Sequence, residues 1–252
     1  MDAAAIHAAI EAGRRFLHAN WDLREAMESD QDNGEPAPAL QKEASPGAPT
    51  VALVPPDKIT VGSMPLIDVM RARRSRRRFA ADPLTLEELS FLLWATQGVR
   101  MRTPKYSLRT VPSGGARHTF ETYLYIARVL GVPNGLYRYQ PLDHLVVLLE
   151  KGADLAARVD EALMEQLWDA AVVFVWTTVP YRMEWRYGPV SHKVIALDAG
   201  HVCQNLYLAC EAVGCGTCGI GAYEQEKMDR LLGVDGHDEF AIYAAPVGKQ
   251  AG

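Results

Sequence analysis

Six of the eight positions from Arg71 to Arg78 are arginine, in a 252-residue chain whose formal net charge is -5 at pH 7. Like charges at this density repel one another, so the cluster calls for an explanation. Guanidinium groups bind a phosphate through paired hydrogen bonds, and the hydroxyl of Ser75 can complete such a contact. The composition therefore fits a phosphorylated cofactor and, equally well, a solvated basic surface or a weak nucleic-acid contact.

Two glycine-rich segments offer backbone that can approach a flat ligand closely. The first runs from Pro112 to His118, ahead of a predicted strand, and contains a serine, two glycines and an arginine. The second runs from Gly214 to Ala222, after a predicted helix. Neither has the lysine spacing of a Walker loop or the GxGxxG pattern of a dinucleotide fold. Alone, they predict either ligand contact or an ordinary turn and helix end.

The four cysteines all lie within sixteen positions, from Cys203 to Cys218. This distribution is not that of a secreted disulfide framework. Cys215 and Cys218 have CxxC spacing, but they follow a predicted helix, and no second CxxC or nearby histidine pair completes a tetrahedral site. We therefore predict no metal site and expect the thiols to be inert packing rather than redox groups.

Composition and charge limit the classes of function. The chain is 48% hydrophobic, which is enough for a sizeable core, and its net negative charge gives no broad positive field for nucleic acid or an anionic membrane. Asp2 and Glu11 interrupt the pattern of a secretory signal, and no apolar run approaches the roughly 20 residues that span a bilayer. We expect a cytoplasmic protein that binds neither nucleic acid nor membrane.

The chain changes character near residue 62. Residues 2–27 have the loose periodicity of a helix. Residues 29–62 are rich in proline, glycine and serine, which predicts an extended arm that wraps over its own domain or over a partner subunit. We therefore divide the chain into residues 1–62, an N-terminal helix with a proline-rich arm, and residues 63–252, a folded domain.

Residues 63–252 mix helices and strands without the regular alternation of a doubly wound sheet, so the predicted fold class is α+β. Thr85 and Glu88 form the capping-box pattern of a helix that ends at Gly98. Predicted helices cover residues 64–73, 85–97 and 224–232, and predicted strands cover residues 120–126, 136–139, 145–149, 170–178 and 239–247.

A longer helix is predicted between the last two strands. Its apolar stripe runs from Ile195 to Val213. Its other side carries small residues that would let a second helix approach closely, namely Ala196, Gly200, Cys203 and Cys210.

Six segments, in order and at plausible spacings, resemble the nitroreductase superfamily, and most closely its SagB/ThcOx-type dehydrogenase branch. The resemblance covers about residues 54–249, and a preceding helix and proline-rich arm are usual for that branch. It implies a nitroreductase-like α+β fold, with an antiparallel-rich central sheet flanked by helices. The segments are RRSRRRF, PLTLEELSFLLWATQG, VPSGGARHTFETYLYI, NGLYRYQP, ALDAGHVCQNLYLACEAVGCGT and GIGAYEQEKMDRLLGVDGHDEF.

The resemblance implies bound flavin mononucleotide (FMN) and assigns residues to its parts. An arginine–serine segment holds the phosphate and ribityl chain, a proline–serine turn reaches the ring from the other subunit, and a later glycine turn supplies a backbone donor to the flavin N5 edge. A basic residue near the last strand closes the phosphate site. An arginine is expected to replace the asparagine that many nitroreductases have at the position of Ala116. These residues, in that order, are Arg73, Arg74, Ser75 and Arg77; Pro112, Ser113 and Gly114; Gly219, Ile220 and Gly221; Lys249; and Arg117.

The implied reaction moves a hydride between a donor and N5 of the flavin, with electrons passed on to an acceptor. NADH or NADPH is a candidate donor, and the substrate class is a small organic molecule or a peptide heterocycle. The resemblance also implies a homodimer in which two subunits share each flavin site.

One position departs from the pattern of the branch. Azoline-oxidising members use a lysine–tyrosine pair for proton removal, and this sequence has Arg186 and Tyr187 there. An arginine stays protonated and is a poor general base, so thiazole or oxazole formation on a peptide is in doubt unless Lys193 or His192 substitutes. Tyr187 and Arg186 are the candidate catalytic pair, and the alternative is a loop tyrosine beside a surface charge.

Two other functions compete with an FMN oxidoreductase. A flavin-free scaffold subunit of a peptide-modifying complex is one, and the retained Arg73, Ser75 and Arg77 argue against it. A nucleic-acid-binding protein that uses the arginine cluster is the other, and the net charge and the lack of an aromatic-rich basic face argue against it.

Overall fold

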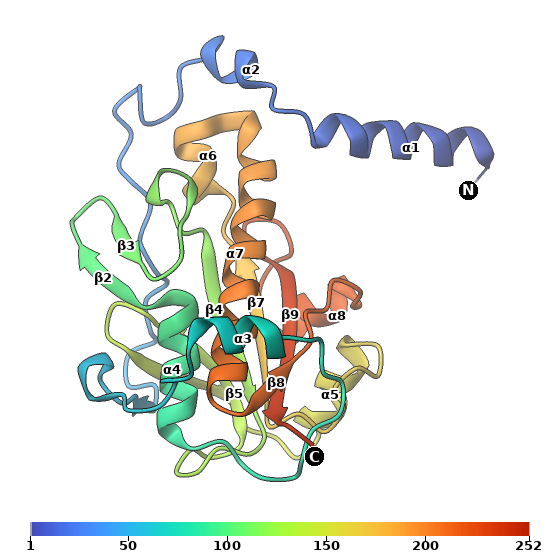
Figure 1. The fold of residues 1–252 in the computed structure, drawn as a ribbon. Coiled ribbons are helices and arrows are strands. Elements are labelled where there is room, and N and C mark those ends of the chain that lie inside the picture. The colour runs from blue at the N-terminus through green and yellow to red at the C-terminus, as the bar shows by residue number, and fades with distance from the viewer. Residues whose placement is uncertain (1, 252) are drawn as a thin grey trace.

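The computed structural model describes residues 2–251, and its centre is a seven-stranded antiparallel sheet (Figure 1). The strands of the described chain are β1 (Thr50–Ala52), β2 (Val99–Arg102), β3 (Ser107–Arg109), β4 (Phe120–Ile126), β5 (Gly135–Gln140), β6 (Leu145–Glu150), β7 (Val172–Thr178), β8 (Cys215–Thr217) and β9 (Phe240–Lys249). The sheet has the order β1-β6-β5-β4-β7-β9-β8, and β2 and β3 form a separate hairpin. The predicted α+β fold with an antiparallel-rich sheet is therefore confirmed.

Strands β4 and β7 form the middle of the sheet. Every residue of both strands is buried, as expected for strands that are covered on both faces. Their register pairs Phe120 with Thr178 and Ile126 with Val172. The unbroken apolar run that ends at Thr178 is thus a central strand, as its composition predicts.

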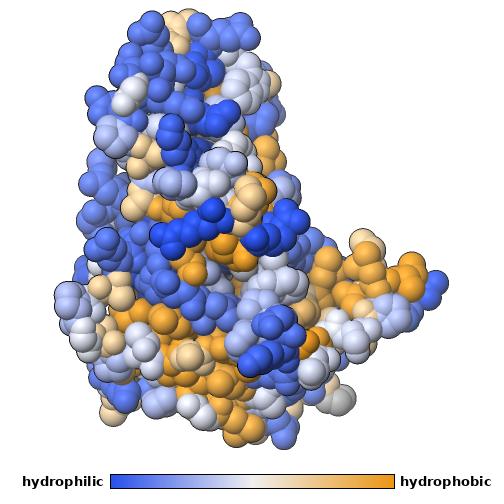
Figure 2. Space-filling model, turned by 90° about the vertical axis from the view of Figure 1, so that its left-hand side faces the viewer, coloured by the Kyte–Doolittle hydropathy of each residue, from blue (hydrophilic) through white to orange (hydrophobic). Residues whose placement is uncertain are grey.

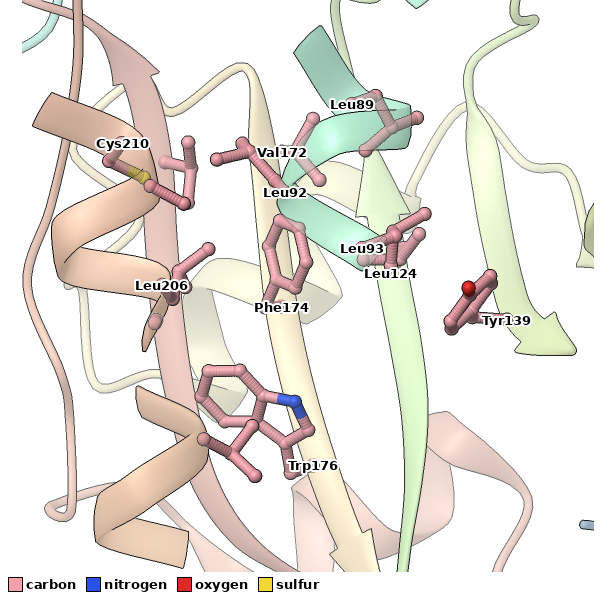
Figure 3. Close-up of a cluster of buried hydrophobic side chains, with 14 of the residues drawn as sticks. Leu89, Leu92, Leu93, Leu124, Tyr139, Val172, Phe174, Trp176, Leu206 and Cys210 are labelled. Atoms are coloured by element: carbon pink, nitrogen blue, oxygen red, sulfur yellow. The ribbon is translucent and has the colours of Figure 1, made fainter. Parts of the chain in front are cut away.

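Helices cover both faces of this sheet (Figure 1). In residues 2–251 they are α1 (Ala3–Phe16), α2 (Trp21–Glu25), α3 (Leu66–Ala72), α4 (Leu86–Gln97), α5 (Leu155–Ala162), α6 (Tyr181–Tyr187), α7 (Ser191–Ala212) and α8 (Gln225–Leu232). One core lies between the sheet, α4 and α7, and contains Leu92, Phe174 and Leu206 (Figure 3). A second core, on the other face, joins the sheet to α5 and α8. No helix in this part of the chain is both long enough and apolar enough to cross a membrane.

Helix α4 begins with the predicted capping box. The Thr85 hydroxyl accepts a hydrogen bond from Glu88 N (3.1 Å), and the Glu88 carboxylate accepts one from Thr85 N (2.8 Å). Gly98 is the C-cap residue, also as predicted. Because both ends of α4 are fixed locally, its buried leucines reach the core in one register.

The four small residues of α7 do not share one face, contrary to the prediction: two are buried and two are exposed. The apolar stripe is buried from Ile195 to Ala209, and Cys203 and Cys210 are buried with it in the subunit's own core. The reason is that α7 packs against both α4 and the β8–β9 edge, which makes its buried face wider than one stripe. Ala196 and Gly200 do lie on the exposed face, beside Leu197, which is 55% exposed.

The N-terminal segment forms two helices instead of the single helix predicted over residues 2–27. Asn20, in the left-handed conformation with φ 49°, separates α1 from α2. Helix α1 stands away from the body (Figure 1), and none of its residues is buried. A hydrogen bond from Lys193 Nζ to Leu17 O (2.5 Å) ties its end to the start of α7.

The proline-rich arm lies along its own domain. Lys42 N donates to the buried Glu121 carboxylate (2.8 Å), and the Arg109 guanidinium donates to Leu40 O (2.9 Å). The same segment supplies the edge strand β1, which pairs with β6. Within the described chain the arm therefore packs on its own subunit. The division into domains at residue 62 stays a prediction.

Candidate functional site

The arginine segment after α3 runs beside β8, at the edge of the sheet. Arg76 N donates to Thr217 O (2.9 Å), and the Arg76 guanidinium donates to both carboxylate oxygens of the buried Glu211, at 3.2 and 3.1 Å. This arginine therefore fixes the segment to α7. Four other arginines form no ion pair within residues 2–251, namely Arg73, Arg74, Arg77 and Arg78. Their charge is available to an external anion.

Tyr207 of α7 joins two of the predicted cofactor segments. Its hydroxyl lies 3.0 Å from Ser75 Oγ and accepts a hydrogen bond from Gly219 N (2.7 Å). The guanidinium carbon of Arg73 lies 5.5 Å from the centre of the Tyr207 ring, in cation–π range. Burial raises the pKa of Tyr207, so its hydroxyl keeps its proton.

The glycine turn after β8 is held by its first two residues. A Cβ on Gly219 would lie 2.6 Å from Tyr243 Oη, so no other residue fits there without displacement. Ile220 N donates to Ala244 O (2.7 Å), and Gly219 N is already bonded to Tyr207. Gly221 is exposed, and its N–H has no partner in the described structure. Among the three predicted residues, Gly221 is therefore the one whose N–H can reach a ligand.

We call this cluster the Tyr207 half-site: Arg73, Ser75, Tyr207, Gly219, Ile220 and Gly221. Its members come from three distant stretches of the sequence, and the fold brings them to one place. Arg77 lies further along the same segment, where its guanidinium carbon is 5.8 Å from the centre of the Trp168 ring. Arg74 is exposed beside it.

The proline–serine turn lies at a different part of α7. Ser113 Oγ accepts a hydrogen bond from His118 N (2.9 Å), and Gly114 N donates to the Asp198 carboxylate at 3.3 Å. Asp198 is buried, and burial raises the pKa of its carboxyl group. A Cβ on Gly114 would lie 2.4 Å from Val194 Cγ1, so the turn rests directly on α7.

The candidate catalytic pair lies against this same turn. Gly115 has φ +57°, and a Cβ there would lie 2.6 Å from Tyr187 Oη and 3.1 Å from Arg186 Nε. The Arg186 guanidinium carbon is 5.4 Å from the centre of the Tyr187 ring. We call this cluster the Gly114 half-site: Pro112, Ser113, Gly114, Gly115, Arg186, Tyr187 and Asp198.

Two residues that were predicted to bind the cofactor already have partners inside the subunit. Arg117 is buried, donates to Lys105 O (2.9 Å) and lies over the Trp185 ring at 4.9 Å. Lys249 forms an ion pair with Glu88 at the start of α4. Each of these side chains therefore already has a partner within its own subunit, and their contact with a cofactor stays a prediction.

The two half-sites lie on opposite sides of α7. Asp198 and Tyr207 are nine residues apart, which in an α-helix is about 14 Å along the axis and half a turn around it. A single flavin ring lying on one side of the helix cannot contact both half-sites of one subunit.

The sequence did not identify Tyr207 or Asp198 as site residues. Both belong to the long helix, whose apolar periodicity marks only its buried stripe. Which of the remaining positions meets a loop depends on where the turns after β3 and β8 cross the helix. No local pattern in the sequence specifies those crossings.

The cysteines are thiols packed in the interior. All four are buried and unpaired, and Cys203 Sγ would lie 3.0 Å from a Cβ on Gly219. Burial raises the pKa of Cys203 and of Cys215 to about 12. Within residues 2–251, no three histidine, cysteine or acidic side chains cluster in a way that would hold a metal ion.

Comparison with known proteins gives one family. The model of the nitroreductase family matches residues 70–249. The putative nitroreductase MJ1384 of Methanocaldococcus jannaschii is 34% identical over 190 residues, which is 73% of this chain and 91% of that protein. The trifolitoxin-processing protein TfxB of Rhizobium leguminosarum bv. trifolii is 26% identical over 163 residues, and the match covers 62% of this chain but only 44% of TfxB.

Solved structures show the same fold. A putative nitroreductase from Ralstonia eutropha JMP134 has a TM-score of 0.66 at 27% identity, covering 86% of this chain and 98% of that one. A chain of the E. coli microcin synthetase McbBCD complex with truncated pro-MccB17 bound has a TM-score of 0.60 at 15% identity, covering 100% and 95%. A putative nitroreductase in complex with FMN from Desulfovibrio desulfuricans has a TM-score of 0.52 at 17% identity, covering 75% and 87%. The last two likenesses are of fold alone.

Proposed function

Because this chain belongs to the nitroreductase family, we propose that it is an FMN-dependent oxidoreductase that works as a homodimer with two shared sites. One observation carries the proposal: the Tyr207 hydroxyl joins Ser75 to Gly219, beside the unpaired Arg73. Residues predicted to bind the phosphate end and the ring edge of one cofactor are thereby held at a spacing fixed by a single side chain.

The residues present fit the phosphate end of FMN. Ser75 is exposed, and Arg73, Arg74 and Arg77 have no carboxylate partner within residues 2–251. A phosphate would take the place of the missing counter-charge, with Ser75 Oγ as an additional donor. Lys249, paired with Glu88, contributes to this site only if that ion pair opens.

The residues also fit the ring. Nothing lies within 4 Å of a Cβ placed on Gly221, so its backbone is open to a flat ligand, and its N–H is the free donor of the turn. FMN, when bound, supplies a ring that accepts and returns a hydride. The part of this chain is to hold that ring, to donate a hydrogen bond to its edge, and to add positive charge nearby.

The surface around the half-sites supports a homodimer. Helix α3 exposes Leu66 (64%), Ile67 (56%) and Met70 (58%), an apolar group too large for an isolated surface helix to present without reason. An apolar groove of about 460 Å³ lies between α3, α4 and α7. Figure 2 shows apolar side chains gathered over the lower part of one face and on the part that stands out to the right. A second copy would cover such a surface.

The Gly114 half-site would complete the partner's flavin site and carry the candidate proton-transfer group. The Arg186 guanidinium supplies a positive charge instead of a base. The Tyr187 hydroxyl, beside Gly115, is the group that can donate a proton to a reduced substrate. We infer a small organic or peptide substrate, with NADH or NADPH as the donor. Support for a peptide comes from the names of TfxB and of the McbBCD complex alone.

The first test is cofactor binding. The purified protein should be yellow and should release FMN on denaturation. Arg73→Ala should weaken FMN binding by about 10- to 100-fold, because a charge-assisted contact to the phosphate is lost. Arg78→Ala, an arginine of the same segment outside the half-site, should change it less than about twofold. A protein that stays colourless with added FMN favours the flavin-free scaffold instead.

A second test addresses the shared site. Arg73→Ala damages the Tyr207 half-site, and Gly114→Ala damages the Gly114 half-site by its clash with Val194. Neither homodimer should bind FMN well. When the two variants are mixed and allowed to exchange subunits, half of the dimers contain one intact site, so occupancy should return to about a quarter of the wild-type value. No recovery from two variants that are both folded by circular dichroism means that each site lies within one subunit.

A further inference from the structure

A cavity of about 360 Å³ lies beside the proline–serine turn. Its lining includes Pro112 and Ser113 of the turn, Arg100 of β2, and Arg109 of β3. Ligand pockets have volumes of about 300–1,000 Å³, so this cavity suits a small group instead of a whole cofactor. None of the residues assigned to the phosphate end of FMN lines it.

The chain around this cavity is basic. Between Leu89 and Phe120 there is no aspartate or glutamate, in a protein that is acidic overall. The same stretch contains five basic residues: Arg100, Arg102, Lys105, Arg109 and Arg117. A local field of one sign, walled by apolar side chains such as Leu108 and Val111, attracts an oppositely charged group strongly.

Arg109 is a buried charge without a carboxylate partner. It is 3% exposed, and its guanidinium donates to Gln97 Oε1 (2.8 Å), to Leu40 O (2.9 Å) and to Ser107 Oγ (3.3 Å). Burial and the neighbouring Arg182 lower the pKa of Arg109 to about 10, so it is still protonated at neutral pH. The one carboxylate that acts on the Arg109 charge, Glu121, is ion-paired with Arg182, so the two arginines leave a net positive charge beside the cavity that Arg109 lines.

Arg100 is the group that can contact a ligand there. Its side chain is exposed, and its Nε donates to Arg109 O (3.2 Å), which fixes its direction. Its two terminal nitrogens have no partner in the described chain. The nearby carboxylate, Asp198, is already bonded to Gly114 N, and His118 is kept neutral because burial lowers its pKa to about 3. None of the residues that line the cavity is acidic, and Arg100 forms no ion pair within residues 2–251.

We propose that this cavity binds the carboxylate of the substrate, with Arg100 as the direct contact and Arg109 as the buried charge behind it. The proposal rests on the proposed function in one respect, because the Pro112 turn borders a flavin ring only if the shared site forms. The substrate class is then a carboxylic acid. It is either a small organic acid or the C-terminal end of a peptide, and both present the same group to Arg100.

The test compares acids with uncharged analogues of the same shape. We expect 4-nitrobenzoate to bind at least about tenfold more tightly than 4-nitrobenzamide in calorimetry, since a charge-assisted contact is made only by the acid. The preference should shrink as salt is added. Arg100→Gln should abolish the preference and Arg100→Lys should keep part of it. Arg102→Gln, the same loss of charge on the same strand, should leave it unchanged.

A parallel comparison identifies the source of the carboxylate. A short peptide with a free C-terminus is compared with its C-terminal amide. A preference for the free peptide alone assigns the cavity to peptide ends, and a preference for nitrobenzoate alone assigns it to small acids. If neither acid is preferred, or if Arg100→Gln and Arg102→Gln reduce the preference equally, the proposal is wrong.

Calorimetry separates this proposal from the proposed function. The titrations use the protein as purified, whatever flavin it carries. A colourless protein that still shows the Arg100-dependent preference contradicts the flavin function and supports the carboxylate site. A yellow protein without the preference contradicts the carboxylate site alone.

Discussion

The two half-sites differ in how many of their polar groups are already bonded within the subunit and in how closely they are packed. In the Tyr207 half-site, Arg73 has no ion pair within the described chain and Ser75 is exposed. In the Gly114 half-site, the backbone of the turn is already bonded and closely packed: Gly114 N donates to the Asp198 carboxylate, and the turn lies against Val194 and Tyr187. One half-site is left unsatisfied, as a receptor for an anion must be. The other is closely packed against α6 and α7, with the backbone of its turn already hydrogen-bonded.

This difference predicts which mutations alter ligand binding and which alter the stability of the fold. Changes in the Tyr207 half-site should alter ligand binding and leave the fold intact, because its free groups contribute little to the subunit's stability. Changes in the Gly114 half-site should alter the fold first, because its residues are packed against α7. Four substitutions test this contrast.

The largest expected effect is at Arg76, the arginine of the segment after α3 that is paired with a buried carboxylate. Arg76→Ala leaves Glu211, which is 3% exposed on its side chain, without its guanidinium partner. Breaking a buried pair from one side costs about 3–5 kcal/mol. Urea denaturation measures the loss, with Arg78→Ala as the control. Equal stability of the two variants would mean that the arginine segment contributes nothing to the fold.

Gly115→Ala tests the packed half-site. The new Cβ would lie 2.6 Å from Tyr187 Oη, at a backbone φ of +57°. We expect a loss of about 2–3 kcal/mol from strain and overpacking together. Gly131→Ala is the matched control, because Gly131 also has positive φ (+80°) but no atom within 4 Å. The difference between the two variants isolates the contact with Tyr187.

Tyr207→Phe tests the open half-site. Removing the hydroxyl leaves Ser75 and Gly219 N without their shared partner, which should weaken FMN binding by about tenfold. The melting temperature of the FMN-free protein should change little. Tyr223→Phe, whose hydroxyl donates to Ala241 O, serves as the control. A Tyr207→Phe protein with normal FMN affinity would remove Tyr207 from the site.

The smallest effect is a pH dependence near the Gly114 half-site. Burial lowers the pKa of His118 from 6.5 to about 3, so protonation favours the unfolded chain. The stability that His118 contributes is present above pH 6.5 and is lost as the pH falls below it, by about 1 kcal/mol between pH 7 and 5.5. His118→Gln should flatten that part of the profile in chemical denaturation.

Local patterns predicted the elements whose ends and faces are encoded in neighbouring residues. The capping box at Thr85 and the apolar run before Thr178 each specify an element without help from distant parts of the chain. The sequence gives no such signal for α5 and α6, with eight and seven residues, or for the three-residue strands β3 and β8, and none of these was predicted. Short elements form because the sheet and α7 supply their contacts.

The sequence likewise predicted only part of the candidate site. The ordered motifs identified Ser75 and Gly219, which the fold brings together, but they also suggested Lys249 and Arg117, whose side chains already have partners within the subunit. Residue type and spacing describe what a side chain can do. Whether a buried neighbour such as Glu88 already occupies it depends on tertiary packing, which one sequence does not reveal.

The helix α7 carries one half-site toward each of its ends. In the proposed dimer, each of the two α7 helices would therefore serve both flavin sites at once, touching one through Tyr207 and the other through Asp198. A small shift of α7 when the first flavin site fills would therefore also move residues of the second flavin site. The two sites should then respond to one another during titration, so that the first and second ligands bind with different affinities.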